Sequence, residues 1–313
     1  MYDLLVVGSG AAGLSAGIYA GRYLLNTVIV QGKDFGGETA VAALIENYPG
    51  YIEIDGYDLM VKMKEQAEHV GAKIMAGWVT AITKKAEGHF VATLGSGETL
   101  EAKSVILATG SRRRRLNLPN EEALTGKGVS YCTTCDAPLY KGKTIAIIGG
   151  GDSSVKGANL AALYAEKVYL IARGKAVNAE PVNYARLTQK KNVEMVYETE
   201  VKEIIGADRL EKIILSKPLN GSVELALGGL FVEVGALPNN DLAKSLGVEL
   251  DARGFVEVDP FMQANIPGVM VAGDLCNETG GFKQDIVAAA QGSMAATSAY
   301  QYVGGLMSTN RSE

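Results

Sequence analysis

The sequence predicts an α/β protein with two Rossmann-like dinucleotide-binding domains. Two segments share one design: an apolar stretch short enough for a strand, a glycine-rich turn, and a helical pattern rich in Ala and Leu. The first apolar stretch begins at Leu4 and the second at Thr144. Because their glycine turns begin at Gly8 and Gly149, 141 residues apart in a chain of 313, each can have its own domain and core.

The first glycine turn has the spacing of a dinucleotide-binding loop. Gly8 lets the chain turn after the strand, Gly10 lets a pyrophosphate approach the backbone, and Gly13 lets the helix pack closely on the sheet. The helix then offers free N–H groups to the phosphates. The next strand, predicted over 27–30, is followed by Gln31 where an acidic residue often binds a ribose, although Gln31 can also hydrogen-bond a ribose. The alternative is a glycine turn in another kind of α/β domain.

The second glycine turn repeats this pattern over residues 149–151, with Ser154 in the third small-residue position. Its following strand is predicted over 167–171. Arg173 and Lys175 come directly after that strand. Two interpretations of these charges are open: a site for the 2′-phosphate of NADPH, or solvated surface charges.

Further strands and two linkers complete the predicted domains. Strands are predicted over 104–108, 230–234 and 269–272, each before a short turn that contains glycine. Two polar segments, 110–119 and 236–241, are candidate linkers.

The composition argues against several classes of protein. The net charge is −5 without a long basic tail, which argues against nucleic acid as the main partner. No apolar run reaches the roughly 18 residues of a membrane-spanning helix, so no membrane association is expected. The chain begins directly with a strand-like stretch and has no secretion signal, so the expected location is the cytoplasm.

Two of the three cysteines, Cys132 and Cys135, lie two residues apart. A zinc site would need four ligands, and the remaining candidates, Cys276, His69 and His89, are not spaced as a second pair, so no metal is expected. Two inert buried cysteines are a second interpretation. The third is a redox pair that cycles between dithiol and disulfide, usually with one thiol acidified at a helix N-terminus.

The cysteine pair is followed directly by Asp136. An exchanging thiolate must be reprotonated during turnover, and the chain has only two histidines. A neighbouring carboxylate is then the natural acid, so Asp136 is the predicted proton donor.

Taken together, these features resemble the low-molecular-weight thioredoxin reductases, from about residue 3 to about residue 303. Each motif is weak alone, but together, in the family's order, they are highly specific. The matching residues are 8–13, 36–37, 46–50, 108–110, 132–136, 149–151, 235, 238–239, 273–274 and 283–284.

The resemblance implies a domain layout. Residues 1–112 and 242–313 would form an FAD-binding domain, and residues 116–238 an inserted pyridine-nucleotide domain that carries the cysteine pair. The domains would rotate about the two linkers, so that the disulfide and the nicotinamide reach the flavin in turn. A homodimer and a thioredoxin or thioredoxin-like partner are also implied.

The resemblance further implies roles for single residues. Cys135 would face the flavin, Cys132 would attack the partner's disulfide, Asp136 would donate the proton and Asp274 would hold the ribityl chain. The residues expected to bind cofactors are Gly8, Gly10, Ala11, Ala12, Gly13, Gln31, Gly32, Gly37, Glu38, Thr39, Asn47, Val79, Ala108, Thr109, Gly110, Gly149, Gly151, Asp152, Ser153, Ser154, Arg173, Gly273, Asp274, Lys283 and Gln284.

The departures from the family concern the electron donor. The NADPH-dependent enzymes carry a His-Arg-Arg run with another Arg four residues on, and here those positions hold Ala172, Arg173, Gly174 and Asn178. Lys283 also stands where the family usually has Arg. NADPH, NADH and reduced ferredoxin therefore all remain candidate donors.

Three functions fit this constellation. The leading hypothesis is a flavin-dependent disulfide reductase that acts on thioredoxin. The second is a dithiol oxidase that passes electrons from substrate thiols to oxygen, and the third is a non-enzymatic flavin sensor.

Two features lie outside the main motifs. Residues 112–115 are four consecutive arginines, interpreted either as a solvated basic run or as a docking patch for an acidic protein such as thioredoxin or ferredoxin. Cys276, close to Asp274, is interpreted as a small buried residue.

Overall fold

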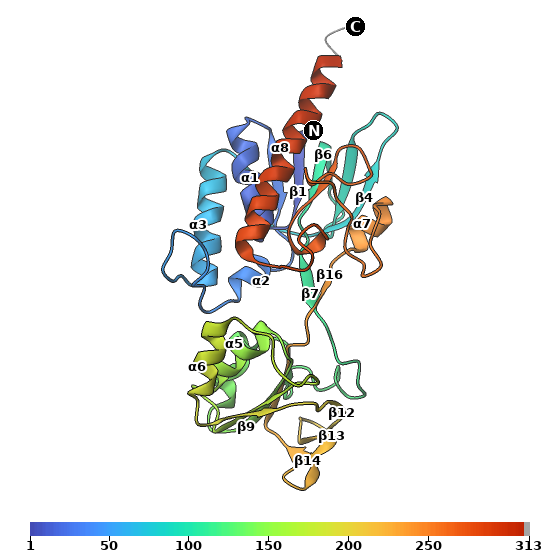
Figure 1. Cartoon of the computed structure of the whole chain (residues 1–313). Coiled ribbons are helices and arrows are strands. Elements are labelled where there is room, and N and C mark those ends of the chain that lie inside the picture. The colour runs from blue at the N-terminus through green and yellow to red at the C-terminus, as the bar shows by residue number, and fades with distance from the viewer. Residues whose placement is uncertain (310–313) are drawn as a thin grey trace. The chain divides into compact units, whose positions relative to one another are not determined.

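The computed structural model describes residues 1–309. The chain forms two compact units (Figure 1). Among the described residues, the first unit contains residues 1–112 and 238–309, and the second unit contains Arg113–Leu237. The boundaries expected at 112, 116, 238 and 242 lie next to this division. Both units have parallel sheets with helices, which confirms the predicted α/β class.

The first unit has a seven-stranded sheet in the order β3-β2-β1-β6-β5-β4, with β17 also pairing with β6. The parallel strands are β1 (Tyr2–Val7), β2 (Thr27–Val30), β3 (Lys73–Met75), β6 (Thr99–Leu107) and β17 (Val269–Val271). An antiparallel extension consists of β4 (Val79–Lys84) and β5 (Phe90–Leu94). Every residue of β2 is buried, as expected for a strand inside a parallel sheet. Since parallel strands end at one edge, the loops after β1, β2 and β6 meet there.

Helices of the first unit pack closely on this sheet. α1 (Ala11–Arg22) contacts both α3 (Gly56–His69) and the long α8 (Asp285–Thr309) (Figure 1). A Cβ at Gly292 of α8 would lie 2.0 Å from the carbonyl oxygen of Ala12, so only glycine permits this approach of α8 to α1. The shorter elements are α2 (Gly37–Ala40), α7 (Asp241–Leu246) and the 3₁₀ turn η2 (Gly273–Leu275).

The second unit has a five-stranded parallel sheet in the order β11-β10-β9-β15-β8. Its strands are β8 (Val129–Ser130), β9 (Thr144–Ile148), β10 (Lys167–Ile171), β11 (Val193–Val196) and β15 (Gly229–Val232). A three-stranded antiparallel sheet is made of β12 (Val201–Ile205), β13 (Lys212–Leu219) and β14 (Ser222–Ala226). The helical elements are α4 (Thr133–Asp136), η1 (Ala137–Tyr140), α5 (Asp152–Ala161) and α6 (Pro181–Thr188).

Both predicted linkers contain a short strand. β7 (Ser111–Arg113) and β16 (Ala236–Pro238) pair with each other as a two-stranded sheet. The backbone N–H of Arg114 donates to Gly235 O at 2.9 Å, and that of Asn239 donates to Gly110 O at 3.0 Å. The two passages of the chain between the units are therefore tied to each other.

Most predicted strands match the structure closely. The strands predicted over 27–30 and 167–171 have these bounds in β2 and β10. The strand predicted over 104–108 begins earlier, at residue 99, because its polar first half pairs with β5. Among the described residues, no helix has both the length and the apolar character needed to cross a bilayer.

Candidate active site

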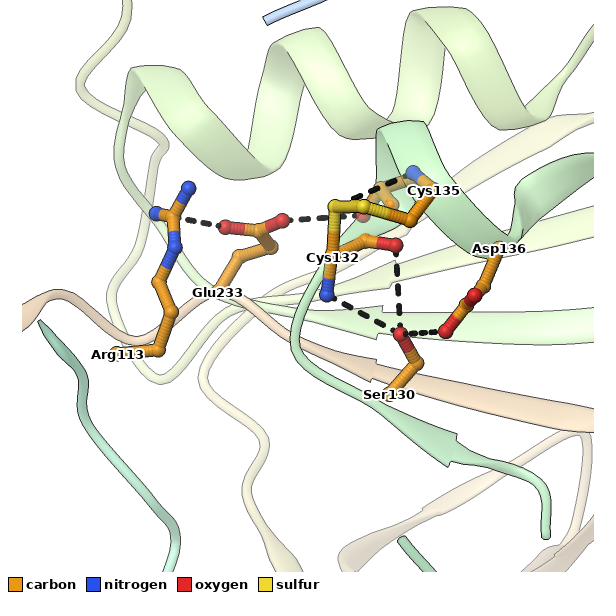
Figure 2. Close-up of a disulfide and its surroundings, with 7 residues drawn as sticks. Arg113, Ser130, Cys132, Cys135, Asp136 and Glu233 are labelled. Atoms are coloured by element: carbon orange, nitrogen blue, oxygen red, sulfur yellow. Dashed lines mark hydrogen bonds and ion pairs between the residues drawn. A yellow bond between two sulfur atoms is a disulfide. The ribbon is translucent and has the colours of Figure 1, made fainter. Parts of the chain in front are cut away.

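Cys132 and Cys135 form a disulfide, with their Cα atoms 5.3 Å apart. Cys132 is the N-cap residue of α4, and its sulfur accepts a 3.2 Å hydrogen bond from the backbone N–H of Cys135 (Figure 2). A bonded sulfur is not a thiolate, so neither cysteine is available as a zinc ligand in this state. The short turn between them keeps both sulfurs in reach of one another, which reversible exchange requires.

The carboxylate of Asp136 is held beside the pair by Ser130. The Ser130 hydroxyl donates to Asp136 Oδ2 at 2.7 Å and accepts from the backbone N–H of Cys132 at 3.1 Å (Figure 2). Ser130 is 4% exposed and ends β8. The sequence interpretation missed Ser130, although a serine two residues before a cysteine pair was a usable signal.

Packing requires two of the three glycines in the first loop. A Cβ at Gly8 would lie 2.2 Å from Ala108 O, and a Cβ at Gly13 would lie 1.9 Å from Gly8 O. A Cβ at Gly10 would meet only Gly36 O, at 3.7 Å. Gly10 is the N-cap of α1 and makes no side-chain cap, so the first N–H groups of α1 are open to a phosphate. This cradle fits the pyrophosphate of a dinucleotide.

Predicted cofactor residues from opposite ends of the chain meet in the first unit. Asn47 Nδ2 donates to Gln284 Oε1 at 3.0 Å across 237 residues. Thr39 Oγ1 donates to Asp285 Oδ1 at 2.6 Å. The start of α8 is thereby joined to α2 and the loop after it.

Two more predicted residues are held by partners that were not among the predicted cofactor residues. Ser111 of β7 donates to Asp274 Oδ2 at 3.1 Å, and the Thr109 hydroxyl donates to Asn239 O at 2.8 Å. The side chain of Asn239 donates back to Thr109 O at 2.9 Å. The loop after β6 is therefore connected to the loop after β17 and to the chain that follows β16.

The other predicted residues of the first unit lie at strand ends or in α1 and α2. Gln31 and Gly32 follow β2, and Gly32 pairs with Gly77, two residues before Val79 at the start of β4. Further positions are Ala11 and Ala12 at the start of α1, Gly37 and Glu38 in α2, Ala108 and Gly110 after β6, Gly273 in η2, and Lys283 before α8.

In the second glycine loop, as in the first, packing requires one glycine while another glycine faces open space. Gly149 has φ +155°, and a Cβ there would lie 2.4 Å from Glu233 O. A Cβ at Gly151 would meet nothing within 4 Å. The Ser154 hydroxyl donates to Gly151 O at 2.7 Å, which holds the start of α5, where Ser153 also lies. Gly151 is the N-cap of α5, as Gly10 is of α1.

Asp152 begins α5 and is surrounded by donors. It accepts from Glu180 N at 2.9 Å and Asn183 Nδ2 at 3.0 Å, and it forms a 2.9 Å ion pair with Lys156. Partial burial raises the pKa of Asp152, but these donors lower the pKa by more, so the carboxylate is ionised at neutral pH. Asp152 is thus committed to contacts within the second unit.

Arg173 is exposed at the position expected to recognise a 2′-phosphate. Lys202 holds the pKa of Glu200 below its usual value, and the charge of Arg173 adds to this effect, so Arg173 lies near an acidic side chain. Asn178 donates its backbone N–H to Gly150 O at 2.7 Å, which draws this segment onto the second glycine loop.

Three of the four arginines at 112–115 contact groups within the chain. The interpretation as a purely solvated basic run is therefore incomplete, although Arg112, Arg114 and Arg115 are exposed. The contacts are Arg112 with Pro238 O and Asn239 Oδ1, Arg113 with Glu233, and Arg115 with Glu122.

Cys276 is fully buried, as expected for a small core residue. Its sulfur donates to Gly273 O at 3.3 Å. Burial raises the pKa of Cys276, so the thiol stays protonated at neutral pH.

Comparison with known proteins gives one consistent family. The family model described as pyridine nucleotide-disulphide oxidoreductase matches residues 2–295. A thioredoxin reductase from Treponema pallidum is 34% identical over 304 residues, covering 96% of this chain and 97% of the relative. The structure of Lactococcus lactis thioredoxin reductase in its FR conformation has a TM-score of 0.92 at 32% identity, covering 97% of this chain and 100% of that one.

A further solved structure bears on the electron donor. A ferredoxin-flavin thioredoxin reductase from Clostridium acetobutylicum is 31% identical, with a TM-score of 0.52, and covers 97% of this chain and 98% of that one. The description of the family thus names a pyridine nucleotide, and the name of this one relative names ferredoxin.

Proposed function

The chain belongs to the thioredoxin reductases within the pyridine nucleotide-disulphide oxidoreductase family, and on this premise we propose that it reduces the disulfide of thioredoxin or a thioredoxin-like protein. The observation that carries the proposal is the Cys132–Cys135 disulfide with Asp136 held at its side. FAD, when bound at the first glycine loop, would take two electrons from a donor and pass them to this disulfide.

The two cysteines then perform the exchange with the partner. The Cys132 thiolate attacks the partner's disulfide and forms a mixed disulfide, while one partner sulfur leaves as a thiolate. Cys135 attacks the mixed disulfide, which releases the partner as a dithiol and restores the Cys132–Cys135 bond. Asp136 supplies a proton to a thiolate of this cycle, and Ser130 keeps the carboxylate in place. Two electrons leave the enzyme's thiols and two enter the partner's disulfide.

We propose a nicotinamide dinucleotide as the donor, bound at the second glycine loop. The room at Gly151 supports this, because a pyrophosphate needs close approach to that backbone. Of the three arginines in the NADPH motif of the family, only Arg173 is present here, and it lies close to Glu200. This argues for NADH over NADPH.

Reduced ferredoxin is the second candidate donor. The departures at Ala172, Gly174 and Asn178 favour it, since a protein donor needs no 2′-phosphate site. The resemblance to a ferredoxin-flavin thioredoxin reductase supports the same choice.

Stopped-flow mixing separates these possibilities. The flavin-loaded protein is mixed with NADPH, NADH or reduced ferredoxin, and flavin bleaching is followed before thioredoxin is added. Fast bleaching by one donor followed by thioredoxin reduction is the expected result. Bleaching only by small dithiols, with peroxide formed in air, would identify a dithiol oxidase, and no turnover with any pair would leave a sensor.

We also propose that the protein works as a homodimer in the cytoplasm, as the family resemblance implies. Sedimentation of the flavin-loaded protein at micromolar concentration tests the dimer, which would appear as a single species of twice the 33.0 kDa chain mass.

A further inference from the structure

A buried carboxylate that the mechanism above does not use lies beside the cysteine pair. Glu233 follows β15, and its side chain is only 5% exposed. Oε1 accepts a 3.0 Å hydrogen bond from the Thr133 hydroxyl, and Oε2 forms a 3.2 Å ion pair with Arg113 (Figure 2). A carboxylate withdrawn from water is costly unless it is compensated, and here the Arg113 cation faces Oε2 while the Thr133 hydroxyl donates to Oε1.

Thr133 connects this carboxylate to the disulfide. It follows Cys132 directly in the chain and is 3% exposed. On its other side it packs against α5, where a Cβ at Gly157 would lie 3.0 Å from the Thr133 hydroxyl oxygen. Thr133 is therefore enclosed between α5 and Glu233, and the peptide that starts the cysteine turn cannot move without disturbing both contacts.

Glu233 is itself anchored by its backbone. Its N–H donates to Ile148 O at 2.8 Å, and its carbonyl oxygen lies against Gly149, the first residue of the second glycine loop. Arg113 ends β7, and the next residue, Arg114, bonds through its N–H to Gly235. The redox turn and the first linker strand therefore contact the carboxylate of Glu233, and the second glycine loop lies against the backbone of the same residue.

We propose that Glu233, with its charge balanced by Arg113, is a positioning residue for the Cys132–Cys135 pair and acts through Thr133. This inference rests on the proposed function, because it assigns a role in the same redox step. The bond to Thr133 holds the turn that carries both sulfurs. The ion pair cancels a negative charge that would otherwise disfavour a thiolate at the adjacent cysteine.

Arg113 and Glu233 carry opposite charges, so removing one charge or the other should change the reactivity of the cysteines in opposite directions. The flavin-loaded protein is reduced, and the rate of cysteine alkylation by iodoacetamide is measured at pH 7 without donor or thioredoxin. We expect Arg113→Met to lower this rate by at least about threefold, and Glu233→Gln to raise it by at least about threefold. The double variant should return to within about twofold of the parent, since both charges are removed together.

The hydrogen bond has a matched control in the same turn. Thr133→Val keeps the branched shape but removes the hydroxyl, while Thr134→Val makes the same change at a side chain that forms no hydrogen bond within the described part of the chain. In glutathione redox buffers we expect Thr133→Val to shift the dithiol–disulfide equilibrium constant by at least about threefold. Thr133→Ser should restore the parent value, and Thr134→Val should stay within about twofold of it.

The outcomes decide the proposal without reference to catalysis. The proposal would be overturned if Arg113→Met and Glu233→Gln changed the alkylation rate in the same direction, or if neither changed it. It would also be overturned if Thr133→Val and Thr134→Val changed the dithiol–disulfide equilibrium constant equally. If Arg113→Met does not fold, Arg113→Lys is measured in its place together with Glu233→Gln. Because lysine keeps the positive charge, we expect Arg113→Lys to be alkylated at the parent rate. A parent protein that fails to reduce thioredoxin would refute the proposed function and leave these thiol measurements interpretable.

Discussion

The hydroxyl of Ser130 donates a 2.7 Å hydrogen bond to the carboxylate of Asp136, six residues further along the chain. Ser130 ends β8, so this bond ties the residue after the second cysteine to the parallel sheet of the second unit. A general acid works only when it stays within reach of the atom that it protonates. The rigid sheet, rather than the four-residue helix α4, therefore sets the position of Asp136.

Substitutions at Asp136 and Ser130 should lower turnover to different extents. Asp136→Asn removes the acid and should lower kcat for thioredoxin reduction about 100-fold or more. Ser130→Ala keeps the acid but removes the hydrogen bond that positions it. It should lower kcat about tenfold, which corresponds to the loss of one hydrogen bond to a charged group. Both kcat values are measured at saturating donor, with flavin content and melting temperature as controls. A loss in Ser130→Ala equal to that in Asp136→Asn would contradict positioning as its role.

Cys135→Ser should abolish disulfide reduction and leave FAD bound, since the first glycine loop belongs to the other unit. Thioredoxin reduction and flavin absorbance are measured on one preparation. Cys276→Ala is the control, because Cys276 is buried and its raised pKa keeps it unreactive. Full activity in Cys135→Ser, or loss of flavin from it, would refute its proposed role.

Gly10 and Gly13 should fail in different ways when each is replaced by alanine. A Cβ at Gly13 collides with Gly8 O, so Gly13→Ala should lower the melting temperature sharply or prevent folding. Gly10→Ala meets nothing closer than 3.7 Å and should lose only about 1 kcal/mol of stability, from its N-cap position. Its affinity for FAD should nevertheless fall at least about tenfold, because the methyl group occupies the space of the pyrophosphate. Thermal unfolding and FAD titration of the apoprotein separate these effects, and unchanged FAD affinity in Gly10→Ala would place the pyrophosphate elsewhere.

Gly151→Ala tests the donor, because a Cβ at Gly151 meets nothing within 4 Å. If a nicotinamide dinucleotide binds at this loop, the variant should fold normally and its KM for NADH or NADPH should rise about tenfold or more. Turnover with reduced ferredoxin serves as the comparison in the same preparation. If KM rises for neither nucleotide, the second glycine loop does not bind the electron donor.

Tyr131 should make stability depend on pH in the alkaline range. Burial, followed by its 2.8 Å hydrogen bond to Glu121, raises the pKa of Tyr131 from 10.0 to about 12. Between these values the unfolded chain has lost a proton that the folded chain keeps, so stability falls as pH rises from 10 to about 12. Tyr131→Phe should lose about 1 kcal/mol near neutral pH and show a shallower fall above pH 10. Urea unfolding from pH 8 to about 11.5 measures both, with Tyr19→Phe, at an exposed position, as the matched control. Equal slopes in all three proteins would argue against this account of Tyr131.

Local patterns in the sequence predicted the class of fold and the chemical groups of the site. An apolar strand that runs into glycine is a short-range signal, so β2 and β10 and both glycine loops could be read directly. The need for glycine at Gly13 is also local, because the obstructing carbonyl belongs to Gly8. The cysteine pair and Asp136 likewise lie within five residues of one another.

Only the tertiary structure decided which distant groups meet. Thr133 and Glu233 are 100 residues apart, and Asn47 and Gln284 are 237 apart, yet each pair is in hydrogen-bond contact. The apolar pattern of a sequence indicates which face of a strand is buried, but it does not indicate which strand lies beside it. Such distant pairs therefore cannot be predicted from that pattern. The short strands β7 and β16 were missed for a related reason. Three residues are too few for a periodic signal, and these two strands are ordered by pairing with each other.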